Sequence, residues 1–264
     1  MPRTTLDEIL AVTRRRVAAL QGQALELERR ATGAPAPRPF LATRGGAPTV
    51  GIVAEVKRRS PSQGAIRADL DPVAHAGAYV RGGAQAVSVL TDEAHFGGSL
   101  ADLAAVAAAV AVPVLRKDFI LDELQLLEAR GAGASAVLLI VRVLPRERLT
   151  ALARVARDHD LATLVEVHDA TELDAALAVH ASAIGVNARD LATFAVDLAG
   201  AERVLARVPR GVPAVAESGV ESRQDVERMA AAGADFVLVG TSVARERDPE
   251  AAVRALTGVK RTER

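Results

Sequence analysis

Three carboxylates in this sequence stand inside short apolar runs, where burial would normally exclude them. Glu55 lies in VGIVAEV, Glu166 in ATLVEV and Glu217 in PAVAES. An unpaired carboxylate is costly in such surroundings, so each of the three implies a charged or hydrogen-bonded partner. Such a network can be purely structural, but acids with perturbed pKa values in a cleft are typical of functional sites.

Basic and amide side chains end the neighbouring runs. Lys57 follows Glu55 by two residues, so that in a strand both would lie on one face while Ile52, Ala54 and Val56 face the other way. Lys117 ends VPVLRK, and Asn187, followed by Arg189, ends SAIGVN. A single Lys or Arg after a strand is commonly solvated. The recurrence of carboxylates and amines at several strand ends is the stronger indication of a site.

Two further runs end in a hydroxyl residue next to glycine. AESGV places Ser218 before Gly219, and LVGTSV places Gly240 before Thr241. Backbone N–H groups at such turns bind phosphate, although Ser, Thr and Gly are also ordinary cap and turn residues. Lys57 and Ser60 could add charge and a hydroxyl. The pair of turns therefore predicts binding of a small phosphorylated molecule.

The elements that would position these residues repeat along the chain after residue 48. Eight apolar runs alternate with helix-like segments, and the junctions RGGAQAVSVL, ARGAGASAVLLI and AAGADFVLVG nearly repeat. Eight βα units predict a closed (β/α)8 TIM barrel over residues 48–258, with the strand ends at the active face. An open doubly wound sheet is the alternative, but EVKRRSPSQG lacks the G-x-G-x-x-G spacing usual after its first strand.

An additional N-terminal helix precedes the predicted barrel. Thr5 and Glu8 have capping-box spacing, and apolar residues recur at helical intervals over residues 5–30. A Pro- and Gly-rich linker follows. We therefore expect a single domain over 1–264: a helical extension and linker over 1–47, the barrel, and a disordered tail over 259–264.

Composition narrows the classes of ligand and compartment. Among the 264 residues, 33 basic and 33 acidic side chains cancel, and the chain has five Phe, one Tyr and no Trp, which argues against nucleic-acid partners. No apolar run is long enough to span a membrane, and no targeting segment is recognisable, so we expect a cytoplasmic protein without membrane partners. With no Cys, and with five His that lack ligand spacing, we expect no metal site.

The strand-end motifs together resemble the indole-3-glycerol-phosphate synthases. The resemblance covers about residues 5–256 and rests on EVKRRSPSQG, SVLTDEAHFGGS, VLRKDFILD, LLIV, LVEVHD, GVNARDL, VAESGV and LVGTSV. It implies a (β/α)8 barrel with an N-terminal helix over its catalytic face. It also implies a carboxy-lyase of tryptophan biosynthesis that cyclises 1-(2-carboxyphenylamino)-1-deoxy-D-ribulose 5-phosphate, releases carbon dioxide and water, and uses no cofactor.

The resemblance also assigns roles. It implies that Lys117 is the general acid of ring closure, that Glu166 is the acid and base of dehydration, and that Glu55, Lys57 and Asn187 orient and polarise the substrate. The expected substrate- and phosphate-binding residues are Lys57, Ser60, Arg189, Glu217, Ser218, Gly219, Gly240 and Thr241. The expected apolar walls around the aromatic ring are Leu90, Phe96, Leu115, Phe119, Ile140, Leu191 and Leu238.

Departures from the family pattern are few. Arg59 replaces a smaller residue, Gly97 replaces an Asn and Phe194 replaces an aliphatic residue. We expect Arg58 to brace the loop after the first strand and Arg59 to be solvated.

Two other functions stay open. A non-catalytic sugar-phosphate-binding barrel would not need both Lys117 and Glu166, and an isomerase of the same pathway would be expected to present a Cys, which is absent. The expected assembly is a monomer or weak homodimer that could associate with other enzymes of tryptophan biosynthesis.

Overall fold

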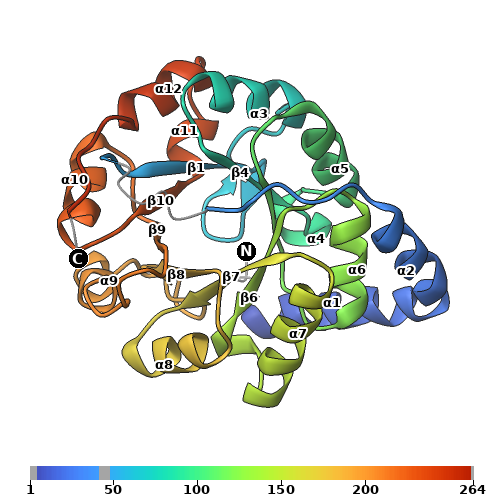
Figure 1. Cartoon of the computed structure of the whole chain (residues 1–264). Helices are drawn as coiled ribbons and strands as arrows, with labels where there is room; N and C mark the ends of the chain where they lie inside the picture. Colours follow the sequence, from blue (N-terminus) through green and yellow to red (C-terminus); the bar gives the residue numbers. More distant parts are fainter. Residues whose placement is uncertain (1–4, 42–47, 263–264) are drawn as a thin grey trace.

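Eight parallel strands form a closed barrel in the computed structural model, which describes residues 5–41 and 48–262 (Figure 1). The hydrogen-bonded order around the barrel is β1-β10-β9-β8-β7-β6-β5-β4, and this confirms the predicted (β/α)8 fold. The barrel strands are β1 (Gly51–Val56), β4 (Ala86–Leu90), β5 (Val114–Lys117), β6 (Ala136–Ile140), β7 (Ala162–Val167), β8 (Ala183–Asn187), β9 (Ala214–Glu217) and β10 (Phe236–Val239).

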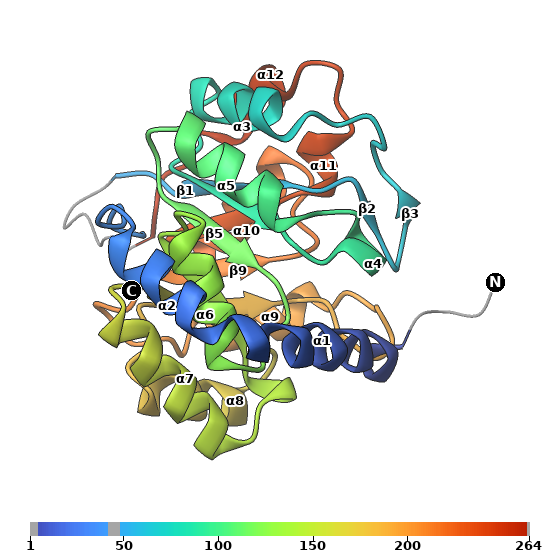
Figure 2. The ribbon, with the colours of Figure 1, turned by 90° about the vertical axis from the view of Figure 1, so that its right-hand side faces the viewer.

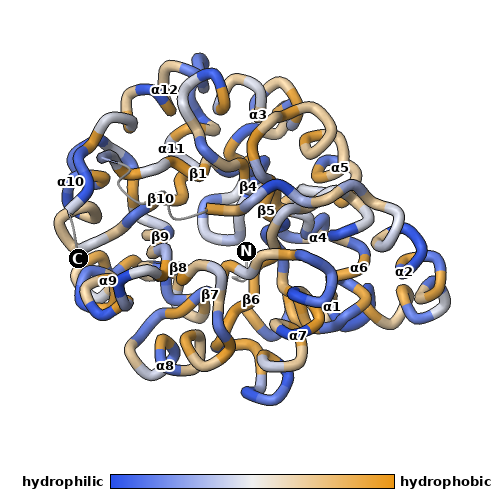
Figure 3. Tube along the Cα trace, in the orientation of Figure 1, coloured by the Kyte–Doolittle hydropathy of each residue, from blue (hydrophilic) through white to orange (hydrophobic). Residues whose placement is uncertain are grey.

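Strand side chains divide between two apolar clusters. Ile52, Ala54 and Val56 pack in the outer cluster with the helices, whereas Val53 belongs to the cluster inside the barrel. This alternation confirms the two faces expected for the first strand. Figure 3 shows the apolar residues concentrated along the strands, while the surrounding helices carry polar stretches on their path around the barrel. Glu55 and the other strand-end charges therefore point to the inside.

Helices surround the barrel and follow its strands in sequence (Figure 1). The helices of the barrel are α3 (Pro72–Arg81), α4 (Glu93–Phe96), α5 (Leu100–Ala109), α6 (Glu123–Gly131), the 3-10 helix η2 (Val141–Val143), α7 (Arg146–Asp158), α8 (Ala170–Ala178), α9 (Leu198–Leu205), α10 (Arg223–Ala231), α11 (Thr241–Ala244) and α12 (Pro249–Leu256).

The repeated junctions in the sequence have a common backbone conformation. Gly83, Gly133 and Gly233 follow α3, α6 and α10 with φ values of 105°, 85° and 99°. Glycine adopts this conformation without the steric cost that a side chain would bring. Each junction can therefore end its helix and turn the chain directly into the next strand.

The N-terminal segment forms two helices where the sequence predicted one. The capping box at Thr5 is present, but α1 (Leu6–Leu20) ends at the 3-10 helix η1 (Gln21–Gln23), which separates it from α2 (Ala24–Gly33). Gly22 lies within η1, and glycine is among the poorest helix formers. In Figure 2, α1 lies at the same end of the barrel as α4 and the short hairpin of β2 (Arg59–Ser60) and β3 (Gly64–Ala65).

The segment after α12 is ordered over residues 259–262, which corrects the expectation of a disordered tail there. Lys260 forms an antiparallel bridge with Thr49, and Val50 donates its backbone N–H to the carbonyl of Val259 at 2.9 Å. Arg261 forms an ion pair with Asp235 at 3.0 Å. Residues 263–264, and the linker residues 42–47, lie outside the described part of the chain. None of the described helices is both long and apolar enough to cross a membrane.

Candidate active site

A cavity of about 160 Å³ opens at the carboxyl ends of the strands, and every barrel strand contributes to its wall. The strand residues that line it are Glu55, Leu90, Lys117, Leu138, Ile140, Glu166, Asn187, Glu217 and Leu238. The loops add Lys57, Ser60, Phe96, Phe119, Arg189, Leu191, Ser218, Gly219, Gly240 and Thr241. All the residues expected at the site therefore lie together, with the exception of Leu115.

Lys117 occupies the centre of an ionic network at the bottom of this cavity. Its Nζ lies 3.3 Å from Glu166 Oε2 and 3.3 Å from Glu217 Oε2. On the neighbouring side, Lys57 Nζ lies 2.7 Å from Glu55 Oε1. These contacts provide the partners that the three buried carboxylates require.

The environment separates the pKa values of these groups. Burial disfavours the charged form of Lys117, but the carboxylates of Glu217, Glu166 and Glu55 outweigh it and raise the pKa of Lys117 above its usual range. Burial opposes ionisation of Glu166 too, yet Lys117 and His168 lower its pKa. For Glu217 burial dominates, and it raises the pKa to about 7 with help from the charge of Glu166. The site therefore holds an ammonium, an ionised carboxylate and a carboxyl group that titrates near neutral pH.

Two glycines, Gly185 within β8 and Gly240 directly after β10, leave the space that these charged groups occupy. A Cβ on Gly185 of β8 would collide with Glu217 Oε1. A Cβ on Gly240 would lie 2.5 Å from Glu55 Oε1 and 3.0 Å from Lys57 Nζ. The network therefore requires glycine at position 185. The sequence had indicated Gly240, as part of a turn, but not Gly185.

The turns after β9 and β10 lie side by side at the cavity wall. Ser218 and Gly219 both have left-handed backbones, with φ values of 65° and 74°. That conformation is uncommon for serine and is concentrated at functional sites. The hydroxyl of Ser242 donates to the carbonyl of Val220 at 3.3 Å and joins the two turns. Ser60, which is buried, lines the same cavity from the loop after β1.

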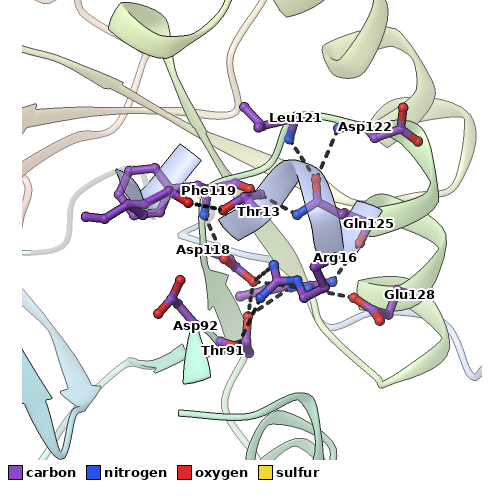
Figure 4. Close-up of polar contacts among 12 residues, drawn as sticks. Thr13, Arg16, Thr91, Asp92, Asp118, Phe119, Leu121, Asp122, Gln125 and Glu128 are labelled. Carbon is purple, nitrogen blue, oxygen red and sulfur yellow. Dashed lines mark hydrogen bonds and ion pairs between the residues drawn. The ribbon is translucent and has the colours of Figure 1, made fainter. Parts of the chain in front are cut away.

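A buried polar network fixes the loop that follows Lys117 (Figure 4). Asp118 Oδ2 accepts hydrogen bonds from Thr91 at 2.5 Å and Arg16 at 2.6 Å, and it also pairs with Arg116 at 3.1 Å. Gln125 accepts from the backbone N–H groups of residues 121 and 122 and donates to the carbonyl of residue 119. Because Arg16 belongs to α1, this network ties the N-terminal helix to the end of β5.

The two arginines after Lys57 both hold loops. Arg58 donates to Asp102 at 2.5 Å and to the carbonyl of Gly97 at 2.9 Å, in agreement with the expected bracing role. Arg59 is exposed but donates to the carbonyl of His95 at 3.1 Å, so it is more than the solvated residue that was expected. Gly97 has a φ of 66°, a conformation that glycine and asparagine both tolerate, which accounts for their exchange here.

The apolar wall differs from the prediction at two strand residues, since Leu138 lines the cavity and Leu115 does not, and it also includes two helix residues that were not predicted. Leu115 pairs with Ser88 two residues below the Leu90–Lys117 pair, so its inward side chain fills the barrel one layer beneath the cavity. Leu6 and Ile9 of α1 line the cavity instead. Their apolar spacing indicated a buried helix face, and the resemblance placed this helix over the catalytic face, but neither selected these two residues. Phe194 also lines the cavity.

The described residues contain no group of three or more His, Cys, Asp or Glu side chains that could hold a metal ion. Ionic, hydroxyl and apolar groups all line the cavity. The arrangement can bind an anionic group at the two turns, accommodate an apolar ring, and move protons through Lys117 and Glu166.

Comparison with known proteins gives a consistent assignment. The family model described as Indole-3-glycerol phosphate synthase matches residues 6–256. An indole-3-glycerol phosphate synthase of Parafrankia sp. is 48% identical over 92% of this chain and 91% of the relative. One from Streptomyces griseus subsp. griseus is 47% identical over 96% of this chain and 94% of the relative.

More distant solved structures share the fold. Thiamine phosphate pyrophosphorylase from Pyrococcus furiosus has a TM-score of 0.58 at 17% identity, covering 78% of this chain and 93% of that one. The 3-hexulose-6-phosphate synthase from Salmonella typhimurium has a TM-score of 0.57 at 16% identity, covering 78% and 96%. The site geometry, the family match and the extent of the identity agree: this chain belongs to the indole-3-glycerol phosphate synthase family.

Proposed function

We propose that Lys117 and Glu166 carry the proton transfers of the family reaction in this chain. As a member of this family the protein is a carboxy-lyase of tryptophan biosynthesis. The reaction converts 1-(2-carboxyphenylamino)-1-deoxy-D-ribulose 5-phosphate into indole-3-glycerol phosphate. The observation that supports these roles best is the position of the Lys117 ammonium, 3.3 Å from two carboxylates in the cavity.

Ring closure requires an acid at the ribulose carbonyl. As the carboxylate-bearing aromatic carbon attacks that carbonyl, the Lys117 ammonium donates a proton to the developing alkoxide. Carbon dioxide then leaves from the ring carbon that attacked, and the protonated alkoxide remains as a hydroxyl on the new ring. The raised pKa of Lys117 means that this acid is fully protonated before the reaction begins.

Dehydration requires both an acid and a base. The hydroxyl departs as water with a proton from an acid, and a base removes a proton from the ring system so that the indole becomes aromatic. Glu166 is ionised at the start because its pKa is lowered, and it is therefore suited to take that proton. Glu55, Lys57 and Asn187 surround the sugar chain and orient it in this proposal.

Different groups of the cavity would bind the phosphate and the aromatic ring of the substrate. The phosphate would accept hydrogen bonds from the turns at Ser218–Gly219 and Gly240–Thr241, with charge from Lys57 and a hydroxyl from Ser60. Arg189 and Glu217 lie at the same cavity and would complete the polar side. The anthranilate ring would lie against the apolar residues of the wall, which include Leu6 and Ile9 of α1. The proposed reaction uses no cofactor or metal.

A fluorescence assay for indole-3-glycerol phosphate tests the activity directly. The purified protein is incubated with the carboxyphenylamino substrate, with and without a chelator. We expect product formation at the same rate in both. Absence of product at micromolar enzyme would contradict the activity, and loss of product on chelation would contradict the metal-free proposal.

The assembly and location of the protein are separate proposals. We propose a cytoplasmic location, as expected of an enzyme of amino-acid biosynthesis. We also propose a monomer or weak homodimer, since a single chain supplies the lining of the cavity described above. Sedimentation of the purified protein over a range of concentrations measures the assembly.

A further inference from the structure

His168 lies directly behind Glu166, on the side away from Lys117, and the mechanism above does not use it. It is the first residue after β7, two positions beyond Glu166, so both side chains emerge on the same side of the strand. Only 6% of its side chain is exposed. No pattern in the sequence distinguishes it from the other four histidines.

The contacts of His168 favour its doubly protonated form. Its Nδ1 lies 3.1 Å from Glu172 Oε2, and its Nε2 faces Glu166 Oε1 at 3.6 Å. Nε2 and Glu166 Oε1 are both buried and have no hydrogen-bond partner among the described residues. A neutral imidazole has one N–H donor and would turn a lone pair toward one of the two carboxylates. The imidazolium carries a proton on each nitrogen and turns a positively charged N–H toward each carboxylate.

Further contacts hold the carboxylate of Glu172 in place. Glu172 Oε2 also accepts the backbone N–H of His168 at 2.7 Å, and Glu172 Oε1 pairs with Arg142 Nε at 2.8 Å. Arg142 in turn pairs with Asp190 at 2.8 Å and Asp169 at 3.8 Å. A chain of alternating charges therefore runs from the loop carboxylates through Arg142, Glu172 and His168 to Glu166.

We propose that His168 is a positioning residue for Glu166: held by Glu172, its imidazolium orients the Glu166 carboxylate and keeps it ionised until it takes its proton. This inference rests on the role proposed for Glu166. The imidazolium faces Glu166 and Glu172, with Arg142 behind Glu172 and Lys117 beyond Glu166. Burial lowers the pKa of His168, but the carboxylates of Glu172 and Glu166 outweigh it and raise the pKa.

The pH dependence of kcat separates positioning from a purely structural role. In His168→Gln the side chain keeps a donor but loses the charge, so the pKa of Glu166 rises. We expect the acidic limb of the kcat profile to move to higher pH by about one unit, the lower end of the effect of an adjacent opposite charge. The matched control is His180→Asn, an exposed histidine with a φ of 54° that asparagine tolerates. A His168→Gln profile that falls uniformly without moving along the pH axis would overturn the proposal.

A second measurement needs no turnover. Titration of the histidine side chains by ¹H–¹⁵N NMR should give His168 a pKa above its ordinary value in the wild-type protein. We expect this pKa to fall in both Glu166→Gln and Glu172→Gln. An unchanged His168 pKa in Glu166→Gln would overturn the coupling even if the wild-type enzyme is fully active. Failure of the wild-type protein to make product would instead contradict the proposed function.

Discussion

At the scale of single residues, the site depends on carboxylates that share one amine yet differ in protonation. Glu166 and Glu217 lie equally close to Lys117, but Glu166 is also stabilised by His168, whereas both oxygens of Glu217 lack a hydrogen-bond partner among the described residues. Burial therefore prevails at Glu217 and raises its pKa to about 7. Neighbouring groups with separated pKa values are the arrangement that acid–base chemistry requires.

This raised pKa makes the stability of the folded protein depend on pH. Between about pH 4.5 and 7 the folded state binds a proton at Glu217 that the unfolded chain has lost, so the free energy of unfolding decreases as the pH rises. The decrease is on the order of 3 kcal/mol, at about 1.4 kcal/mol per pKa unit. In Glu217→Gln, the free energy of unfolding measured with urea should not show this decrease between pH 4.5 and 7. The control Glu227→Gln removes an exposed carboxylate, and its free energy of unfolding should decrease with pH as in the wild type. A Glu217→Gln curve parallel to the wild type would contradict the assignment.

Gly185 gives a second residue-scale prediction. In Gly185→Ala the added Cβ would displace the Glu217 carboxylate from Lys117. Displacement of an active-site group by about 1 Å can cost up to about 10²-fold in rate. We expect kcat to fall by at least tenfold while the circular dichroism spectrum keeps its native form. Gly22→Ala has nothing within 4 Å of the new Cβ and is the matched control. A wild-type kcat in Gly185→Ala would contradict this prediction, because it would mean that Glu217 can move aside without loss of activity.

At the scale of elements, the sequence predicted most accurately what strand periodicity determines. Glu55 and Lys57 share a face because they are two residues apart, and they lie in the cavity. The depth of a side chain depends on the stagger between strands, and this is why Leu115 was placed one layer too high. The covering of the cavity by Leu6 and Ile9 depends on how α1 docks, and Arg16, which holds it, is one of three consecutive arginines. No local pattern distinguishes the docked arginine from its neighbours.

Substitution of these arginines tests the docking of α1. Arg16→Ala removes the ion pair with Asp118. The side chain of Asp118 is fully buried, and it still pairs with Arg116 in this variant. We expect the free energy of unfolding to fall by about 1.5–3 kcal/mol, typical of a hydrogen bond to a charged group. We also expect kcat/KM to fall, because α1 carries Leu6 and Ile9 of the cavity wall. Arg15→Ala, exposed on the same helix, should leave the steady-state kinetics unchanged. Equal kinetics for the two variants would contradict the role of Arg16.

At the scale of the whole molecule, the barrel brings together residues that lie far apart in the sequence. The count of eight βα units predicted this closure, and the polar strand ends followed from it. Side-chain contacts across the barrel could not be predicted in the same way, since the pairing of Lys117 with Glu166 and Glu217 depends on rotamers and on space left by Gly185. The bridge between Thr49 and Lys260 was missed because the last residues carry no strand-like pattern.

The ends of the barrel chain provide a prediction at this scale. A chain that stops at Gly258 loses the pairing of residues 259–262 with residues 48–50 and the ion pair of Arg261 with Asp235. We expect the melting temperature to fall by several degrees, since about 1 kcal/mol corresponds to roughly 2–4 °C at this size. Lys260→Ala keeps the backbone pairing and is the control. An unchanged melting temperature in the shortened chain would contradict a stabilising role for these residues.

The most direct test of the proposed chemistry is the turnover of Lys117→Met. Methionine keeps much of the side-chain volume but removes the ammonium that donates the proton in ring closure. With saturating substrate, we predict that kcat falls by about 10²-fold or more, while the exposed Lys260→Met keeps the wild-type value. A Lys117→Met enzyme that forms indole-3-glycerol phosphate at the wild-type rate would contradict the account.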